Sequence, residues 1–148
     1  MKKILAIASG GGHWVQLLRL MPAFKDHDVS FVSTNQVYEK MVHPHAFYTV
    51  KNSSRRSMLS VFRSSQAVLS IIMKVRPNII ITTGAAPGLM FILAGKLIGA
   101  KTIWVDSIAN VEELSLSGRL AVKIADRIYT QWPELSTDKV IYSGNVIS

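Results

Sequence analysis

The stretch that decides the fold is Lys3-Ile4-Leu5-Ala6-Ile7-Ala8-Ser9-Gly10-Gly11-Gly12-His13, residues 3–13 of the chain. Its apolar run over Lys3–Ala8 shows no polar alternation and predicts a β-strand that is buried on both faces. The glycines predict a tight turn, and a helix is then predicted from His13 to about Phe24, because apolar residues recur at helical spacing. Strand, glycine turn and helix in this order are typical of the start of an open α/β sheet.

The rest of the chain repeats this alternation of short apolar runs with helical patterns. The further predicted strands are Val29–Ser33, Ala46–Val50, Asn78–Thr82, Thr102–Val105, Arg127–Thr130 and Lys139–Tyr142. The further predicted helical segments are a short one near Val37–Met41, then Ser57–Val75, a helix from Pro87 towards Gly99, and Ser117–Ala125. The sequence therefore predicts one domain over residues 1–148, a Rossmann-like parallel sheet with helices on both faces.

Composition and charge narrow the function. The chain has 148 residues, a net charge of +8 and no cysteine, which excludes a disulfide scaffold, a thiolate metal site and a cysteine nucleophile, and agrees with a reducing cytoplasm. From Lys40 to Val105 there is no Asp or Glu but there are nine Lys and Arg residues. Because no nucleic-acid-binding motif is recognisable, this basic block indicates a phosphorylated ligand or an anionic membrane surface.

The Ser57–Val75 helix is the candidate for membrane contact. Its predicted apolar face consists of Met58, Val61, Phe62, Leu69 and Ile72, with Arg56, Ser60, Arg63, Ser70 and Lys74 on the other side. Such a helix could lie at an anionic membrane interface. It could equally be an ordinary crossover helix with a solvated basic face.

The Ser9-Gly10-Gly11-Gly12-His13 loop is a candidate phosphate site. A glycine turn at the start of a helix exposes backbone N–H groups and the positive helix end to an anion. A dinucleotide site is disfavoured, because Val15 stands where the third glycine is needed and no acidic residue ends the second strand. A P-loop is excluded, since no Gly-Lys-Ser/Thr follows. His13 is either a general base, a hydrogen-bond donor to a diphosphate, or merely a residue at a helix start.

Two further loops are predicted at the carboxyl ends of strands, where ligands bind in open α/β sheets. Gly84, Ala85 and Gly88 belong to a second small-residue turn, which repeats the first loop or is a plain strand-to-helix connection. Asp106, Ser107 and Asn110 follow the fifth strand and could bind sugar hydroxyls, act as acid or base, or cap a helix. No carboxylate cluster suitable for a metal ion is visible, so no metal is expected.

The order of these motifs resembles one known family. The bacterial PssD/CpsF type of polysaccharide-biosynthesis glycosyltransferase subunit is similar to this chain over nearly its whole length. That type is itself similar to the membrane-anchoring subunit of the eukaryotic two-part dolichol-diphosphate-GlcNAc N-acetylglucosaminyltransferase. The resemblance rests on the Ser9–His13 loop, Thr83-Gly84, Asp106-Ser107-x-Ala109-Asn110, Leu114-Ser115-Leu116-Ser117-Gly118-Arg119-Leu120, Ala125-Asp126-Arg127 and Gln131-Trp132-Pro133-Glu134-Leu135, in this order.

The resemblance implies the N-terminal, acceptor-side half of a GT-B glycosyltransferase that is divided between two polypeptides. A separately encoded partner would hold most of a UDP-sugar, which is a co-substrate and not a bound cofactor. The sugar would pass to a polyprenyl-diphosphate-linked acceptor in exopolysaccharide or capsule synthesis, on the inner face of the cell membrane. One expectation is that the chain ends near Tyr142–Val146, where a single-chain enzyme would cross into its second domain.

The resemblance also implies roles for particular residues. His13 is the first candidate for the catalytic base and Asp106 the second, and the other predicted contacts to acceptor or phosphate are Ser9, Gly10, Gly11, Gly12, Gly84, Ala85, Gly88, Ser107 and Asn110. The family pattern has Arg where this chain has Asn110, and Arg55 or Arg56 is the candidate to supply the missing charge. The alternatives are a non-catalytic membrane scaffold that activates its partner and a stand-alone nucleotide-binding or reductase domain.

Overall fold

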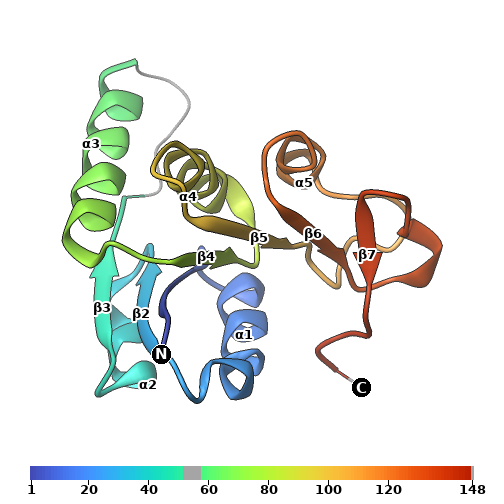
Figure 1. The fold of residues 1–148 in the computed structure, drawn as a ribbon, viewed down its shortest axis with the longest axis horizontal. Coiled ribbons are helices and arrows are strands. Elements are labelled where there is room, and N and C mark those ends of the chain that lie inside the picture. Colours follow the sequence, from blue (N-terminus) through green and yellow to red (C-terminus); the bar gives the residue numbers. More distant parts are fainter. Residues whose placement is uncertain (52–57, 148) are drawn as a thin grey trace.

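A single parallel sheet organises the molecule, which is described here from a computed structural model that covers residues 1–51 and 58–147. Its seven strands lie in the order β3-β2-β1-β4-β5-β6-β7, and every neighbouring pair is parallel (Figure 1). All seven predicted strands are confirmed, with ends that differ by one residue at most. The strands are β1 (Lys3–Ile7), β2 (Asp28–Ser33), β3 (Ala46–Thr49), β4 (Ile79–Thr82), β5 (Lys101–Val105), β6 (Arg127–Thr130) and β7 (Val140–Tyr142).

Helices lie on both sides of this sheet, as predicted. In Figure 1, α3 (Met58–Val75), α4 (Ala85–Leu97) and α5 (Leu116–Ala121) lie above it, and α1 (Gly12–Arg19) and α2 (Glu39–Val42) lie below it. The short 3-10 helices are η1 (Met21–Phe24), η2 (Gln36–Tyr38) and η3 (Pro133–Leu135).

The core consists of two apolar layers, one on each face of the sheet. Leu5 and Ile7 of β1 point into one layer, and Ile4 and Ala6 point into the other, because successive side chains of a strand alternate between faces. Strands that are covered on both faces are mostly apolar. This is why β1 is an apolar run after its exposed first residue, Lys3. Trp14 of α1 is fully buried and stacks on Tyr38, with ring centroids 4.9 Å apart.

Two of the predicted helices are too long. The first helix ends at Arg19, and η1 follows with Pro22 in its first turn, since a proline lacks the N–H that a continuing helix needs. The predicted Ser117–Ala125 helix is the shorter α5.

The predicted apolar face of α3 is only partly right. Ile72 is buried as predicted, beside Val68 and Ile71, whereas Phe62 and Leu69 face solvent. The helix is apolar around most of its circumference, so periodicity alone could not indicate which side meets the sheet.

One sheet face is left partly open. Below the sheet, α1 and η1 cover β1 and β2, but no described helix covers β4, β5 and β6. A groove of about 580 Å³ lies there, floored by apolar side chains of these strands and bordered by η1 on one side and residues 143–146 on the other. The floor residues are Ile79, Ile81, Ile103, Val105 and Tyr129.

Across the described residues, the helices are too short or too polar to cross a membrane.

Candidate functional site

The candidate site lies between β1 and β4, where the order in which the chain adds strands to the sheet reverses. The neighbouring strands β1 and β4 send the chain to opposite sides, since β1 leads through α1 to β2 and β4 leads through α4 to β5. The loops at their carboxyl ends therefore separate and leave a crevice, which is the usual ligand position in open α/β sheets. The two predicted glycine loops, Ser9–His13 and Gly84–Gly88, meet at this point, since His13 bonds to Thr83.

His13 is held in this crevice by the β4 loop. Its Nδ1 lies 3.0 Å from the carbonyl oxygen of Thr83, and the Thr83 hydroxyl donates in return to the His13 carbonyl at 2.6 Å. A carbonyl oxygen only accepts, so Nδ1 carries the proton in this contact. The neutral ring then keeps its lone pair on Nε2, the nitrogen that can take a proton from a reacting hydroxyl.

Gly84 makes room for the His13 ring. A Cβ at this position would stand 3.0 Å from both Cε1 and Nδ1 of the imidazole, and the backbone has φ +128°. Ala85 follows with φ +71°, a left-handed conformation that costs a non-glycine residue roughly 1 kcal/mol. The turn between β4 and α4 is thus strained and sterically tight where it meets His13.

Both helices at the crevice begin without a side-chain cap. The N-cap residue is Gly11 for α1 and Gly84 for α4, and neither helix start receives a capping bond from a side chain. Uncapped N–H groups and the positive helix ends suit an anion such as a phosphate. One backbone N–H of the Ser9–His13 loop already has a partner, because Gly11 donates to the Tyr38 hydroxyl at 3.0 Å.

The remaining loop residues differ in what surrounds them. Gly12 is exposed with open space around it, whereas Ser9 is buried and a Cβ on Gly10 would meet the Tyr38 hydroxyl at 3.0 Å. Gly88 lies inside the first turns of α4, where a Cβ would come within 2.2 Å of the Thr82 hydroxyl. Close packing of α4 on β4 therefore requires a glycine here, and a contact of Gly88 with a ligand stays a prediction.

Asp106 is enclosed by hydrogen-bond donors. The side chain is buried, 2% exposed, and its carboxylate accepts bonds from Trp104 Nε1 at 3.0 Å and from Asn110 Nδ2 at 3.2 Å. Ser115 adds two more, from its backbone N–H at 3.0 Å and its hydroxyl at 2.7 Å. Four donors occupy most of the lone pairs of a carboxylate. The geometry thus favours a positioning role for Asp106 over proton transfer, and its role as a base stays a prediction.

Ser107 belongs to a second buried network, which connects it with Gln16 and Gln131. Sequence reasoning missed Gln16, and it named Gln131 only as part of a motif, without a role. Gln16 of α1 donates to the Ser107 hydroxyl at 3.1 Å, and its carbonyl accepts from the backbone N–H of Ile108 at 3.0 Å. Gln131 bonds to Gln16 at 2.6 Å and to the Asp106 carbonyl at 3.0 Å, and it accepts from the N–H of Val146. The network therefore ties the β5 loop to α1 and to the last described residues.

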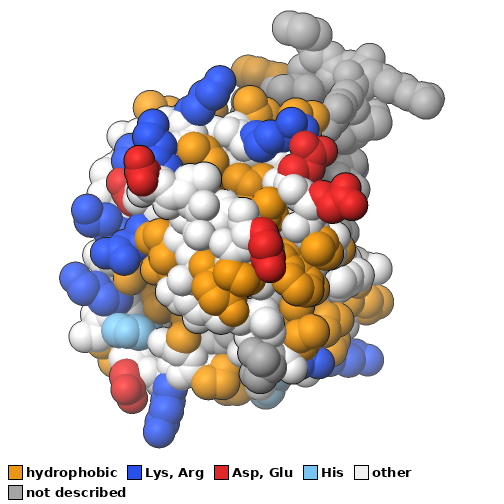
Figure 2. Space-filling model, turned by 90° about the vertical axis from the view of Figure 1, so that its right-hand side faces the viewer, with side chains coloured by type: hydrophobic (Ala, Val, Ile, Leu, Met, Phe, Trp, Pro, Cys, Tyr) orange, Lys and Arg blue, Asp and Glu red, His pale blue; other side chains and the backbone are white. Residues whose placement is uncertain are grey.

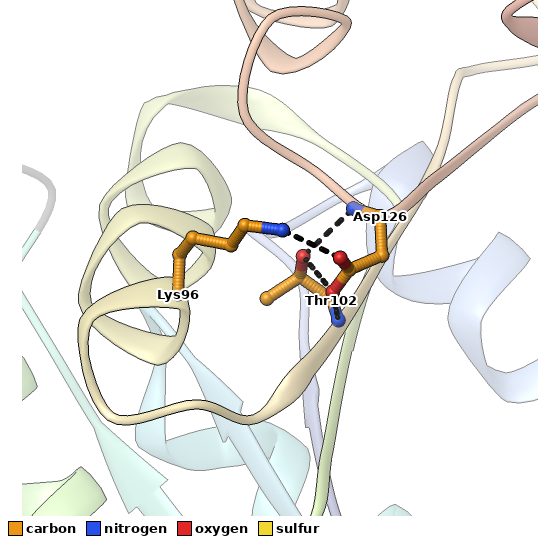
Figure 3. Close-up of polar contacts among 3 residues, drawn as sticks. All are labelled: Lys96, Thr102 and Asp126. Carbon is orange, nitrogen blue, oxygen red and sulfur yellow. Dashed lines mark hydrogen bonds and ion pairs between the residues drawn. The ribbon is translucent and has the colours of Figure 1, made fainter.

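Asp126, from the Ala125-Asp126-Arg127 motif, lies at the opposite, amino edge of the sheet. Figure 3 shows its carboxylate between Lys96 of α4 and Thr102 of β5, which donates through its N–H at 2.8 Å and its hydroxyl at 3.0 Å. The Lys96 hydrogen bond, followed by the backbone N–H of Thr102, lowers the pKa of Asp126 from 3.8 to about 2. This motif residue joins α4, β5 and the start of β6, and it is remote from the crevice.

Two predicted residues, Arg55 and Arg56, lie outside the described residues. Among the residues that the structure covers, no group of three or more His, Asp or Glu side chains is gathered to hold a metal ion.

Solved structures share this fold. The MurG structure from Acinetobacter baumannii matches with a TM-score of 0.80 at 12% identity, over 98% of this chain and 46% of that one. UDP-GlcNAc 2-epimerase from Neisseria meningitidis, bound to UDP-GlcNAc, matches with a TM-score of 0.70 at 12% identity, over 97% and 47%. The chain thus spans about half the length of these proteins, and its fold is that of the N-terminal half of GT-B enzymes, as predicted.

Sequence relatives are more specific than the fold. UDP-N-acetylglucosamine transferase subunit ALG14 of Mus musculus is 23% identical over 98% of this chain and 83% of its own length. The alg14 subunit of Schizosaccharomyces pombe is 28% identical over 92% and 78%. A family model described as "Oligosaccharide biosynthesis protein Alg14 like" matches residues 31–146. The strand order, the crevice loops and these matches agree, and the chain belongs to the family of Alg14-like oligosaccharide biosynthesis proteins.

Proposed function

We propose that this chain is the acceptor-side subunit of a divided GT-B glycosyltransferase. It would take part in transferring a sugar from a UDP-sugar to a polyprenyl-diphosphate-linked acceptor during exopolysaccharide or capsule synthesis, as the resemblance to the PssD/CpsF type implies. The observation that carries this proposal is the crevice at β1 and β4, where two uncapped helix starts face the same space as His13. A diphosphate suits the helix starts, and a sugar hydroxyl suits Nε2 of the imidazole.

His13 is the proposed base in this reaction. The Thr83 carbonyl sets its tautomer and orientation, much as a buried acceptor orients the imidazole in other acid–base sites. Nε2 then accepts the proton of the acceptor hydroxyl while that oxygen attacks the anomeric carbon of the donor sugar. The nucleotide diphosphate leaves with the bonding electron pair, and this step needs no further group from the described chain.

The proposed partner is a separately encoded donor-binding half. A GT-B reaction takes place between two such domains, and the named relatives are themselves transferase subunits. The groove under β4–β6 offers that partner an apolar docking surface of the kind that parallel sheets normally bury. Figure 2 views the β7 end of the molecule, where hydrophobic side chains lie over the middle, Lys and Arg side chains lie along one side, and a few Asp and Glu side chains lie among them.

The test is sugar transfer by the assembled pair. A donor half is first sought among the products of neighbouring genes, and the chain is co-purified with the candidate. Transfer of labelled sugar to a short-chain polyprenyl-diphosphate acceptor is then measured. We expect His13→Ala to lower kcat by roughly 100-fold or more, the usual contribution of a general base, with assembly unchanged. His45→Ala is the matched control, because His45 is exposed, packs on the Phe31 ring and precedes β3, at the amino edge of the sheet and away from the crevice.

A non-catalytic scaffold is the second candidate, and the enclosed Asp106 carboxylate favours it. Because the Asp106 carboxylate already accepts four hydrogen bonds, His13 is the remaining one of the two predicted bases, and catalysis by this chain then depends on His13. If His13→Ala leaves turnover unchanged in a normally assembled complex, the scaffold is correct and the chemistry belongs to the partner.

A further inference from the structure

Tyr38 contacts the Ser9–His13 loop from the segment that follows the neighbouring strand. It lies in η2, after β2, and β2 pairs directly with β1, so the segments that follow these two strands are side by side. The Tyr38 hydroxyl accepts a hydrogen bond from the Gly11 N–H at 3.0 Å. A Cβ on Gly10 would stand 3.0 Å from the same hydroxyl oxygen. Two consecutive glycines of the loop therefore pass close to one side-chain atom.

The Tyr38 side chain is anchored by the protein itself. Its ring stacks on the Trp14 indole, with centroids 4.9 Å apart and an interplanar angle of 20°, and Trp14 is fully buried in the first turn of α1. Asn35 caps η2, because its side chain accepts from the Val37 N–H at 3.1 Å. The Asn35 carbonyl also accepts from the Tyr38 N–H at 3.3 Å. Both the backbone and the ring of Tyr38 are thus held in place without a ligand.

The glycine loop needs such an anchor. A run of glycines loses more conformational freedom on folding than other residues do, and Gly11 adopts φ +69° and ψ −135°, outside the regions that L side chains favour. The first bond of the α1 ladder runs from the Val15 N–H to the Gly11 carbonyl at 3.2 Å. The N–H groups of Gly12 and His13 come before this bond, so their direction depends on how the Gly11 backbone is turned.

We propose that Tyr38 is a positioning residue for the diphosphate of the acceptor. Its hydroxyl holds the Gly11 backbone so that the N–H groups at the start of α1 are presented to the crevice, and an anion then meets a loop that is already ordered. In this role the phenol takes no part in proton transfer, and the Thr83 carbonyl holds His13 separately. The inference rests on the proposed function for the identity of the ligand.

The opposite role for the same contact is a plug. A hydroxyl on the Gly11 N–H could take the place of a phosphate oxygen, which a ligand would then have to displace. Gly12 favours positioning, because it is exposed and nothing lies within 4 Å of a Cβ built there, so an anion can reach the start of α1 without moving Tyr38. Removal of the hydroxyl separates the two roles, since it weakens anion binding if Tyr38 positions the loop and strengthens it if Tyr38 is a plug.

The first experiment removes only this hydroxyl. Tyr38→Phe keeps the ring on Trp14, and inorganic pyrophosphate is titrated into the isotope-labelled chain without partner or nucleotide sugar. We expect pyrophosphate to shift the amide resonances of Gly11 and Gly12 in the wild type. The variant should bind pyrophosphate roughly 3- to 10-fold more weakly, the usual effect of losing one neutral hydrogen bond. Without ligand, the amide hydrogen of Gly11 should exchange faster in the variant.

Two further variants separate this effect from a general loss of structure. Tyr142→Phe is the matched control, because it removes an exposed tyrosine hydroxyl from β7, the edge strand far from β1 and β2. It should change neither the pyrophosphate affinity nor the exchange of Gly11. Tyr38→Leu also removes the stacking on Trp14 and should lower the unfolding temperature. Tyr38→Phe should unfold close to the wild-type temperature, because Gly11 is exposed and its N–H can bond to water instead.

The second experiment compares KM with kcat in the assembled pair. With a short-chain polyprenyl-diphosphate acceptor, Tyr38→Phe should raise the KM for the acceptor by a similar factor and leave kcat nearly unchanged, since His13 keeps its bond to Thr83. His13→Ala should instead lower kcat. A purely structural role of Tyr38 would not produce this separation.

Four outcomes would overturn the proposal. Pyrophosphate that shifts neither amide in the wild type, or that binds the wild type and Tyr38→Phe equally, would show that the hydroxyl does not position an anion. Tighter binding by Tyr38→Phe would make Tyr38 a plug, and a fall in kcat as large as that of His13→Ala would place it in the chemistry. Failure of the proposed function is recognised independently, because the assembled pair would then transfer no sugar while pyrophosphate still shifts the Gly11 amide.

Discussion

Gly84 shows how one backbone position controls the candidate base. We expect Gly84→Ala to displace the His13 ring, because the new Cβ would stand 3.0 Å from Cε1 and Nδ1, and to lower the free energy of unfolding by roughly 1–2 kcal/mol through its positive φ. The ring resonances of His13 in NMR spectra report the displacement.

Gly99→Ala is the matched control for that substitution. Gly99 also has a positive φ, +80°, but a Cβ there would meet nothing within 4 Å. It should lose stability by a similar amount while the His13 resonances stay in place. Unchanged His13 resonances in Gly84→Ala would show that the glycine does not position the ring.

Asp126 makes stability depend on pH in the acid range. Its pKa is about 2 in the folded chain, against 3.8 without the contacts, so the folded state favours the carboxylate. The resulting stabilisation is complete above about pH 5 and is lost as the pH falls from there towards 2. Since Lys96 is about half exposed and solvent screens its charge, we expect this stabilisation to be on the order of 1 kcal/mol.

The measurement for Asp126 is denaturant unfolding between pH 2 and pH 6. Asp126→Asn should remove this part of the pH dependence, and the difference between wild type and variant should shrink as the pH approaches 2. An identical pH profile for the two proteins would contradict the assignment of the shift to this carboxyl group.

At the scale of elements, Ser115 joins helix α5 to the β5 loop. Its hydroxyl caps α5 by accepting from the Gly118 N–H at 2.9 Å and donates to Asp106. Ser115→Ala should therefore lower the free energy of unfolding by about 1–2 kcal/mol, as the loss of a helix cap usually does. Ser117→Ala, within the same helix, should change it by less than about 0.5 kcal/mol. If Ser115→Ala lowers the free energy of unfolding no more than Ser117→Ala does, the cap and the Asp106 contact contribute nothing measurable.

The elements also show which features a sequence can reveal. The strands of this fold were predictable because strands of a parallel sheet are mostly apolar, as in residues 4–7 of β1. The orientation of α3 was not, because Phe62 and Leu69 are as apolar as the buried Val68 and Ile72. Here the periodicity that indicates a helix does not indicate its buried side.

The candidate site was predictable in part from the sheet. The loops that follow parallel strands all lie at the same edge of the sheet, so the Ser9–His13 and Gly84 loops were expected near each other. The pairing of Gln16 with Gln131 spans 115 positions and depends on tertiary packing. The four hydrogen bonds to the Asp106 carboxylate likewise depend on how the chain folds around it, and the sequence pattern does not predict them.

At the scale of the whole molecule, the groove under β4–β6 predicts that the proposed partner stabilises the chain. A donor half that binds the folded chain and not the unfolded chain raises the free energy of unfolding. The increase is about 2.7 kcal/mol when the donor half is present at 100 times the Kd. We therefore expect a higher unfolding temperature for the co-purified pair than for the chain alone. Ile103→Arg, at the floor of the groove, should abolish that rise, whereas Val37→Arg should not. Equal unfolding temperatures with and without the partner would show that the groove is not the docking surface.

The groove under β4–β6 also bears on protein turnover. A chain made in excess of its proposed partner would leave this apolar groove uncovered, and uncovered apolar surfaces favour aggregation and proteolysis. The supply of the donor half would then limit how much of this chain persists in the cell. Gene dosage of one subunit should thus set the abundance of the other.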